Sequence, residues 1–284
     1  MSIKIDRLLS RAKKLNKKGQ FKEAKKIYQD ILESFPSNKE AKIGLVELNQ
    51  NKETKPNKNQ LEALVDLHKT GEFQKALFVI DDLIKTYDND PFLFNIKGSC
   101  LCETGDLNAS IISFEKAITL KPDYAEALFN LGVAYQKLNQ SDMAIETYEK
   151  ALVFQHAYPT AHHNLGIIYF NKNQLSSAIK SFEWAVAYSP NYSEAYYSLG
   201  SAFQKNRQFQ EAKKHFEKAI SVNPNYAQAY ESLGILCEII NLRNEAVGYF
   251  EKALTINPHL TNTYRNLSKL KKFKVKDPLI RQME

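Results

Sequence analysis

Two adjacent histidines, His162 and His163, and three cysteines are the side chains of this chain best suited to bind a metal ion. Adjacent residues on a helix point about 100° apart, so the two imidazoles do not converge on one ion. Cys100 and Cys102 diverge for a similar reason, and Cys237 is distant in sequence. An odd number of cysteines also argues against a disulfide framework. The sequence therefore predicts no metal site and no cofactor.

Catalytic motifs with a recognisable spacing are also missing. The chain contains no GxxxxGK[ST], GxGxxG, GxSxG or HExxH segment. These motifs bind phosphate groups, position a nucleophile or bind a catalytic zinc ion. We therefore expect the residues present to carry no enzymatic activity.

The elements of the chain repeat with a period of 34 residues instead. Six units follow one another without a gap, and an earlier unit occupies residues 5–38. The six units are residues 57–90, 91–124, 125–158, 159–192, 193–226 and 227–260. A repeat of this length predicts a stack of helical hairpins, because a single hairpin cannot bury its own apolar side.

Small and large residues recur at fixed positions of each unit, counted from its first residue. Position 8 is glycine in Gly98, Gly132, Gly166, Gly200 and Gly234. Position 24 is aromatic in Phe114, Tyr148, Phe182, Phe216 and Phe250. We expect the glycines to let the two helices of a hairpin approach closely and the rings to fill the remaining space. Proline at position 32 in four units predicts the end of each second helix.

This pattern resembles the tetratricopeptide repeat family over nearly the whole chain. The resemblance implies an all-α fold, a right-handed α-solenoid in which the first helix of each hairpin lines a concave groove. The unit at residues 57–90 departs from the pattern, because Leu64 stands at the glycine position and Asp88 at the proline position.

In this family a peptide or protein partner binds in the groove, so the resemblance implies the binding residues. Groove positions of the first helices supply the candidates Asn95, Phe129, Asn130, Val133, His163, Asn164, Ile167, Tyr197, Ser201 and Glu231. In protein O-glycosyltransferases with similar repeats, asparagines at position 6 hold the backbone of an extended peptide, since an amide both donates and accepts hydrogen bonds. We interpret Asn130 and Asn164 in this way, with the aromatic and apolar residues receiving peptide side chains. The alternative is that these asparagines bond to a neighbouring helix.

Four segments are predicted along the chain. Residues 1–50 form a hairpin with an extra helix, 51–60 a polar linker, 61–272 a six-repeat superhelix with a capping helix, and 273–284 the start of a further helix. The segment YRNLSKLKKFKVKDPLIRQME resembles the junction between tetratricopeptide repeats and the catalytic domain of bacterial sulfotransferase-type proteins. We therefore expect the chain to be part of a longer protein.

Charge and hydropathy limit the classes of partner. Residues 1–60 carry 15 lysines and arginines against 7 acids, whereas residues 61–260 carry 17 against 23. The basic ends lack the interleaved aromatic residues of single-strand binders, so nucleic acid is not the expected partner. No apolar stretch of about 18 residues and no signal sequence is present, which predicts a cytoplasmic protein.

The favoured function is a protein-interaction scaffold, and self-association through the terminal helices stays open. The second hypothesis is the substrate-recruiting arm of a truncated sulfotransferase or O-glycosyltransferase.

Overall fold

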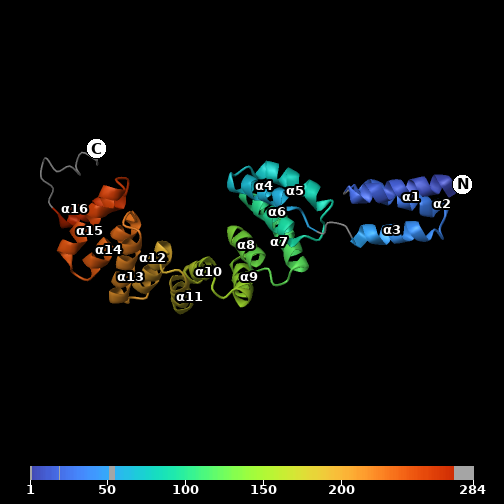
Figure 1. Ribbon diagram of the computed structural model, residues 1–284. Helices are drawn as coiled ribbons and strands as arrows, with labels where there is room; N and C mark the ends of the chain where they lie inside the picture. Colours follow the sequence, from blue (N-terminus) through green and yellow to red (C-terminus); the bar gives the residue numbers. More distant parts are fainter. Residues whose placement is uncertain (1, 19, 51–54, 272–284) are drawn as a thin grey trace. The chain divides into compact units, whose positions relative to one another are not determined.

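A computed structural model describes residues 2–18, 20–50 and 55–271 and consists of helices and short connections (Figure 1). These ranges hold sixteen helices, α1 to α16. No helix among them combines the length and apolar character needed to cross a membrane. The all-α expectation is therefore confirmed, and the segment 273–284 lies outside the described residues.

The chain divides into two compact units, residues 1–93 and 94–284, with the division inside α6 (Pro91–Glu103). The helices of the first unit are α1 (Ser2–Lys17), α2 (Phe21–Ser34), α3 (Lys39–Gln50), α4 (Lys58–Lys69) and α5 (Phe73–Ile84). Those after α6 are α7 (Leu107–Leu120), α8 (Ala125–Lys137), α9 (Ser141–Phe154), α10 (Pro159–Asn171), α11 (Leu175–Tyr188), α12 (Ser193–Lys205), α13 (Phe209–Val222), α14 (Ala227–Ile239), α15 (Arg243–Ile256) and α16 (Thr261–Leu270).

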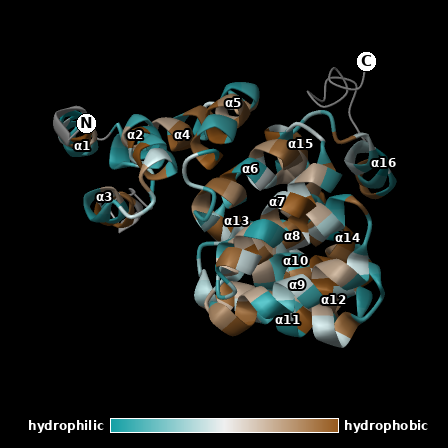
Figure 2. Cartoon of the chain, turned by 90° about the vertical axis from the view of Figure 1, so that its right-hand side faces the viewer, coloured by the Kyte–Doolittle hydropathy of each residue, from teal (hydrophilic) through white to brown (hydrophobic). Residues whose placement is uncertain are grey.

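Helices α8 to α15 form four consecutive hairpins, which follow one another in Figure 1. The second helix of each hairpin packs against the first helix of the next, and α16 packs against α15. Figure 2 shows brown and teal segments on the same helices, as expected when one side of each helix is apolar. This paired stacking is typical of a tetratricopeptide superhelix.

The small and large residues pack as the sequence predicts. A methyl group added at any of the five position-8 glycines would lie between 2.5 and 2.7 Å from the ring at position 24 of the same unit. Non-bonded carbon atoms do not come this close, so glycine is required at position 8 for the two helices of a hairpin to pack at this distance. The five rings are at most 1% exposed. They form the core between the two helices of each hairpin.

The unit at residues 57–90, which departs from the repeat pattern, packs its two helices with other side chains. Leu64 and Ile80 occupy positions 8 and 24, and both are completely buried. A larger residue at the first position is matched by a smaller residue at the second. The bulk is thus shared between the two positions, and both side chains are accommodated between α4 and α5.

The start of α4 corrects the predicted linker at residues 51–60. The backbone N–H of Gln60 donates to the Asn57 side chain at 3.0 Å, and the Asn57 N–H donates to the Gln60 side chain at 2.9 Å. This reciprocal capping box begins a helix at Lys58. Residues 58–60 are therefore helical.

The turn inside each hairpin has a left-handed residue at position 15, a feature that the sequence analysis missed. The φ angle is positive at Gly71, Gly105, Asn139, Asn173, Arg207 and Asn241. Glycine and asparagine tolerate this conformation, and their recurrence at one position was the available signal. Arg207 is the one residue of this set that is neither glycine nor asparagine, and its φ is 59°.

Candidate functional site

The inner face, which we define as positions 5, 6 and 9 of the first helices α6, α8, α10, α12 and α14, contains the ten predicted binding residues. Asn95 is completely buried and His163 is 8% exposed, so neither presents a significant surface to a ligand. The other eight are partly exposed: Phe129, Asn130, Val133, Asn164, Ile167, Tyr197, Ser201 and Glu231. The accessible part of the predicted site is therefore carried by α8, α10, α12 and α14.

The asparagines of position 6 bond within the protein. Asn130 Nδ2 donates to Asn95 Oδ1 at 3.0 Å, which connects α8 to α6. Asn164 Nδ2 donates to the hydroxyl of Tyr148 at 3.2 Å, which connects α10 to α9. These contacts match the alternative interpretation of the asparagines, in which they bond to a neighbouring helix. A peptide backbone would have to compete for the Asn130 and Asn164 amides or use their remaining acceptors.

His163 is held in the wall of the inner face by two hydroxyl groups. Its Nε2 lies 3.0 Å from Ser198 Oγ, and its Nδ1 lies 3.1 Å from the hydroxyl of Tyr192. Burial lowers the pKa of the imidazole below its usual value of 6.5. His163 is therefore a neutral bridge between α10 and α12.

A tyrosine at position 34 contacts the position-5 residue in each of four units, and the sequence analysis missed this row. The tyrosines are Tyr124, Tyr158, Tyr192 and Tyr226. Asn95 donates to the first at 3.3 Å, and Phe129 and Tyr197 pack on the rings of the second and fourth at 4.9 and 5.2 Å. Burial raises the pKa of Tyr158 and Tyr226 to about 12. The row supports the inner face from behind.

A recess of about 350 Å³ opens between α10 and α12. It is lined by Ile167, Phe170, Phe182, Tyr197, Ser198 and Ser201. Three of these residues were predicted from the sequence, and Phe170 and Ser198 are additions from positions 12 and 6. The volume is at the lower end of the range for ligand sites and suits one or two side chains. Three aromatic rings and three hydroxyl groups, those of Tyr197, Ser198 and Ser201, make the recess apolar with a polar edge.

The rim of the recess carries a positive charge at Lys205. Its ammonium nitrogen lies 4.5 Å from the centre of the Phe170 ring and 3.4 Å from the Phe170 carbonyl oxygen. A cation over an aromatic face is attracted by the electrons of the ring. Both rim contacts therefore hold the ammonium group beside the recess.

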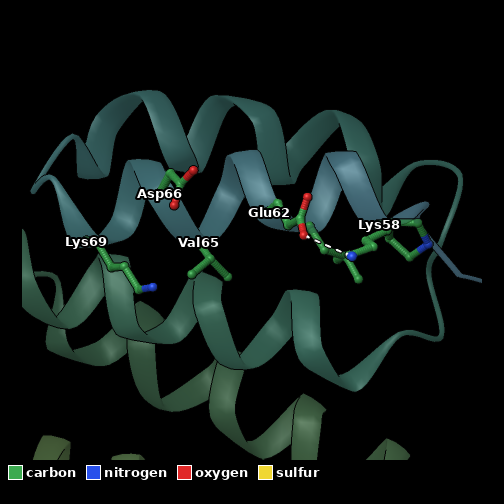
Figure 3. A pocket seen from close by; sticks show the side chains of 7 residues that line it. Lys58, Glu62, Val65, Asp66 and Lys69 are labelled. Carbon is green, nitrogen blue, oxygen red and sulfur yellow. Dashed lines mark ion pairs between the residues drawn. The ribbon is translucent and has the colours of Figure 1, made fainter.

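A second hollow lies along α4 in the first unit and has a different character. Figure 3 shows Lys58, Glu62, Val65, Asp66 and Lys69, which come from this one helix. Lys58 and Glu62 form an ion pair at 3.6 Å and are both largely exposed. Such surface pairs contribute little energy, and polar groups from different elements do not converge here. The recess between α10 and α12 is the better candidate site.

An aromatic cluster of Trp184, Tyr188, His156 and His162 shares no residue with the lining of the recess. Trp184 stacks on Tyr188 at 5.5 Å and on His162 at 6.2 Å, and it is 39% exposed. The units on either side have lysine at the position of Trp184. The sequence analysis interpreted Trp184 as packing, and its contacts with three neighbouring rings agree with that interpretation.

The cysteines and histidines do not form a metal site among residues 2–18, 20–50 and 55–271, where no group of three or more potential ligands is found. All three cysteines are free and buried. Burial raises the pKa of the Cys100 thiol to about 11, so it is protonated near neutral pH.

Acid should destabilise the protein through its buried imidazoles. Burial lowers the pKa of His162, His163 and His215 below 6.5. The unfolded chain binds a proton at each near pH 6.5, whereas the folded chain does so only at lower pH. The contribution of these neutral imidazoles to the free energy of unfolding is therefore complete above pH 6.5. It should be lost as the pH decreases through the folded pKa values. Urea unfolding between about pH 7.5 and pH 5 measures this, and His163→Phe should flatten the decrease. A free energy that stays constant over this range would contradict the prediction.

Models of known families match the chain in several places. A model described as TPR repeat matches residues 98–139 and 168–206, and models described as tetratricopeptide repeat match residues 9–38, 125–157, 193–226 and 227–260. These ranges contain all five aromatic residues of position 24 and four of the five position-8 glycines, Gly166 being the exception.

Solved structures agree with the family matches. A crystal structure of MamA is 32% identical with a TM-score of 0.55, and the alignment covers 57% of this chain and 94% of that chain. A crystal structure of YrrB, described as a TPR protein with an unusual peptide-binding site, is 21% identical with a TM-score of 0.58, covering 66% and 96%. PilF of Pseudomonas aeruginosa is 14% identical with a TM-score of 0.66, covering 75% and 96%, and it shows the fold alone.

Curated relatives match over shorter stretches. The DnaJ homolog subfamily C member 3 of Gallus gallus is 24% identical over 137 residues, which is 48% of this chain and 27% of that protein. The CTR9 homolog of Arabidopsis thaliana is 34% identical over 83 residues, 28% of this chain and 8% of that protein. The chain thus spans about a quarter or less of the length of these relatives. The repeat pattern, the hairpin packing and the family matches together lead to one conclusion: the chain belongs to the tetratricopeptide repeat family.

Proposed function

We propose that this chain is a protein-interaction scaffold that binds an extended peptide segment of a partner on its inner face, with the recess between α10 and α12 as the principal contact. The observation that carries the proposal is the recess itself. It is an apolar hollow with hydroxyl groups at its edge, built on rigid and closely packed helices. A partner side chain entering it would meet Ile167, Phe170 and Tyr197.

The residues around the recess support this role. Tyr197 packs on Phe216 and Tyr226 with ring centres 5.6 and 5.2 Å apart, so its ring is fixed before any ligand arrives. Fixed aromatic side chains reduce the entropy cost of binding. The fold is shared with YrrB, a TPR protein described as having a peptide-binding site. Tetratricopeptide proteins bind proteins and peptides generally, and the partner is the specific part of the proposal.

The second candidate function is the substrate-recruiting arm of a longer transferase. It depends on the resemblance of residues 264–284 to a sulfotransferase junction. The matched family ranges end at residue 260, and residues 272–284 lie outside the described residues. The family comparisons therefore give the junction no support, and the scaffold is the stronger proposal.

Selection from a displayed library of random peptides tests the scaffold function. Peptides enriched on the full chain should lose about tenfold or more in affinity for Tyr197→Ala, because a truncated aromatic anchor commonly costs more than 1 kcal/mol. Isothermal calorimetry with selected peptides measures this loss. Trp184→Ala is the matched control, since it removes another exposed aromatic ring outside the recess.

Comparing Tyr197→Ala with Trp184→Ala shows whether peptides bind at the recess or at the aromatic cluster. Unchanged affinity for Tyr197→Ala combined with a loss for Trp184→Ala would move the docking site to the aromatic cluster of α11. Circular dichroism of both variants should show wild-type helix content, because each side chain is partly exposed.

A further inference from the structure

Lysines stand at or just after the ends of three of the five inner-face helices, and they differ in their partners. Lys137 at the end of α8 pairs with Glu103 at 3.1 Å, and Lys172 after α10 pairs with Asp142 at 2.5 Å. Lys205 at the end of α12 contacts the ring and carbonyl oxygen of Phe170 and has no carboxylate partner among residues 55–271. Its charge is therefore available beside the recess.

Tyr197 places a hydroxyl group at the recess. Its hydroxyl oxygen accepts a hydrogen bond from Ser232 Oγ at 3.4 Å. Both groups are hydroxyls, so either can act as the donor of this bond. The other polar groups are already engaged: Ser201 Oγ donates to the Tyr197 carbonyl at 2.9 Å, and Ser198 Oγ bonds with His163. The recess thus offers a phenol and an ammonium donor to a ligand rich in acceptors.

The distribution of charge fixes the place of an acidic group. Glu194 in the first turn of α12 is exposed, and it lies eleven residues or about 16 Å along the helix from Lys205. An acidic ligand group is repelled at the Glu194 end and attracted at the Lys205 end. His163 is neutral because burial lowers its pKa, so it does not change this polarity.

The distance along α12 sets the spacing in a bound peptide. Ser201 lines the recess, and Lys205 follows it by four residues, which is about 6 Å along a helix. Two residues of extended chain span about the same distance. A peptide running along α12 could therefore place one side chain in the recess and the side chain two residues later beside the ammonium group of Lys205.

From these observations we infer that the recess selects a peptide in which a large apolar residue lies within two positions of an aspartate or glutamate. The apolar side chain enters between Ile167, Phe170 and Tyr197, and the carboxylate binds Lys205 in place of the contact with the Phe170 ring. The inference rests on the proposed function and names the class of partner segment: acidic and apolar.

Charge reversal at the rim tests the inference. Peptides selected from a random displayed library on the full chain should be enriched in the apolar and acidic pair. Selection on Lys205→Glu should lose the acidic preference and gain lysine or arginine at that place. A peptide selected on the wild type should bind Lys205→Glu about tenfold more weakly, and the difference should shrink in high salt.

Lys218→Glu is the matched control, because Lys218 also lies over an aromatic ring, 5.9 Å from the centre of Tyr196, but on α13. It should keep the acidic preference. Peptides that depend on Tyr197 but show no acidic preference, or a preference that survives Lys205→Glu, would overturn the inference and leave the proposed function standing. Failure to select any peptide that depends on Tyr197 would overturn both.

Discussion

Replacing Gly234 with leucine is expected to lower the free energy of unfolding by about 3 kcal/mol, the upper part of the range for overpacked cores. A methyl group at this position would already lie 2.5 Å from Cε1 and 2.6 Å from Cδ1 of Phe250. Phe250 is completely buried between α14 and α15, so its ring has no free space to enter. Leucine adds further carbon atoms in the same direction. Urea unfolding followed by circular dichroism measures the change.

The same hairpin provides the control. Gly248 lies in α15, two residues before Phe250, and no atom would lie within 4 Å of a methyl group added there. Gly248→Leu should leave stability unchanged or raise it by up to about 1 kcal/mol, because leucine favours a helix more than glycine does. Equal destabilisation by both substitutions would show that the cost does not come from the contact with Phe250.

A compensating substitution makes the contact itself measurable. Unit 57–90 combines leucine at position 8 with isoleucine at position 24, as Leu64 and Ile80. The double variant Gly234→Leu, Phe250→Ile copies this pair and should be more stable than the sum of the two single effects predicts. A double-mutant cycle with a coupling energy of about 1 kcal/mol or more would confirm that the two positions share one volume. Additive effects would contradict it.

The fold was predictable because its determinants recur in the sequence. Glycine and aromatic residues at a 34-residue spacing identify the hairpins without any contact information, and proline two residues after α7, α11, α13 and α15 agrees with the observed helix ends. The capping box at Asn57 occurs once, so no repeat marked it, and its polar residues were assigned to the predicted linker. The left-handed turn residues recur, but their role depends on the backbone angle at position 15, which composition does not show.

The candidate site was only partly predictable, because the first-helix pattern gives the face of a residue and not its partners. Ile167, Tyr197 and Ser201 were assigned to the inner face, and they do line the recess. Asn95 occupies an equivalent position, yet it is completely buried. Tyr124, Glu126 and Asn130 form hydrogen bonds with the buried Asn95 side chain. The residue pattern of the first helix does not predict these bonds.

Asn95 is therefore expected to contribute to stability more than to binding. Its Nδ2 donates to the Tyr124 hydroxyl at 3.3 Å and to Glu126 Oε1 at 3.1 Å, and its Oδ1 accepts from Asn130 at 3.0 Å. Asn95→Leu keeps a similar volume but leaves these three partners without their shared amide. We expect the free energy of unfolding to fall by about 2 kcal/mol, since unpaired buried polar groups cost about 1–3 kcal/mol each.

Asn164→Leu separates the structural role from a binding role. Asn164 also stands at a position assigned to the ligand, but it is partly exposed and makes one bond, to the Tyr148 hydroxyl. Its loss should cost less than about 1 kcal/mol, because water can replace the partner of an exposed amide. At a temperature where both variants are folded, Asn95→Leu should bind the selected peptides like the wild type. Wild-type stability together with weakened peptide binding would show instead that Asn95 reaches the ligand, through an opening of α6 against α8 that frees its amide.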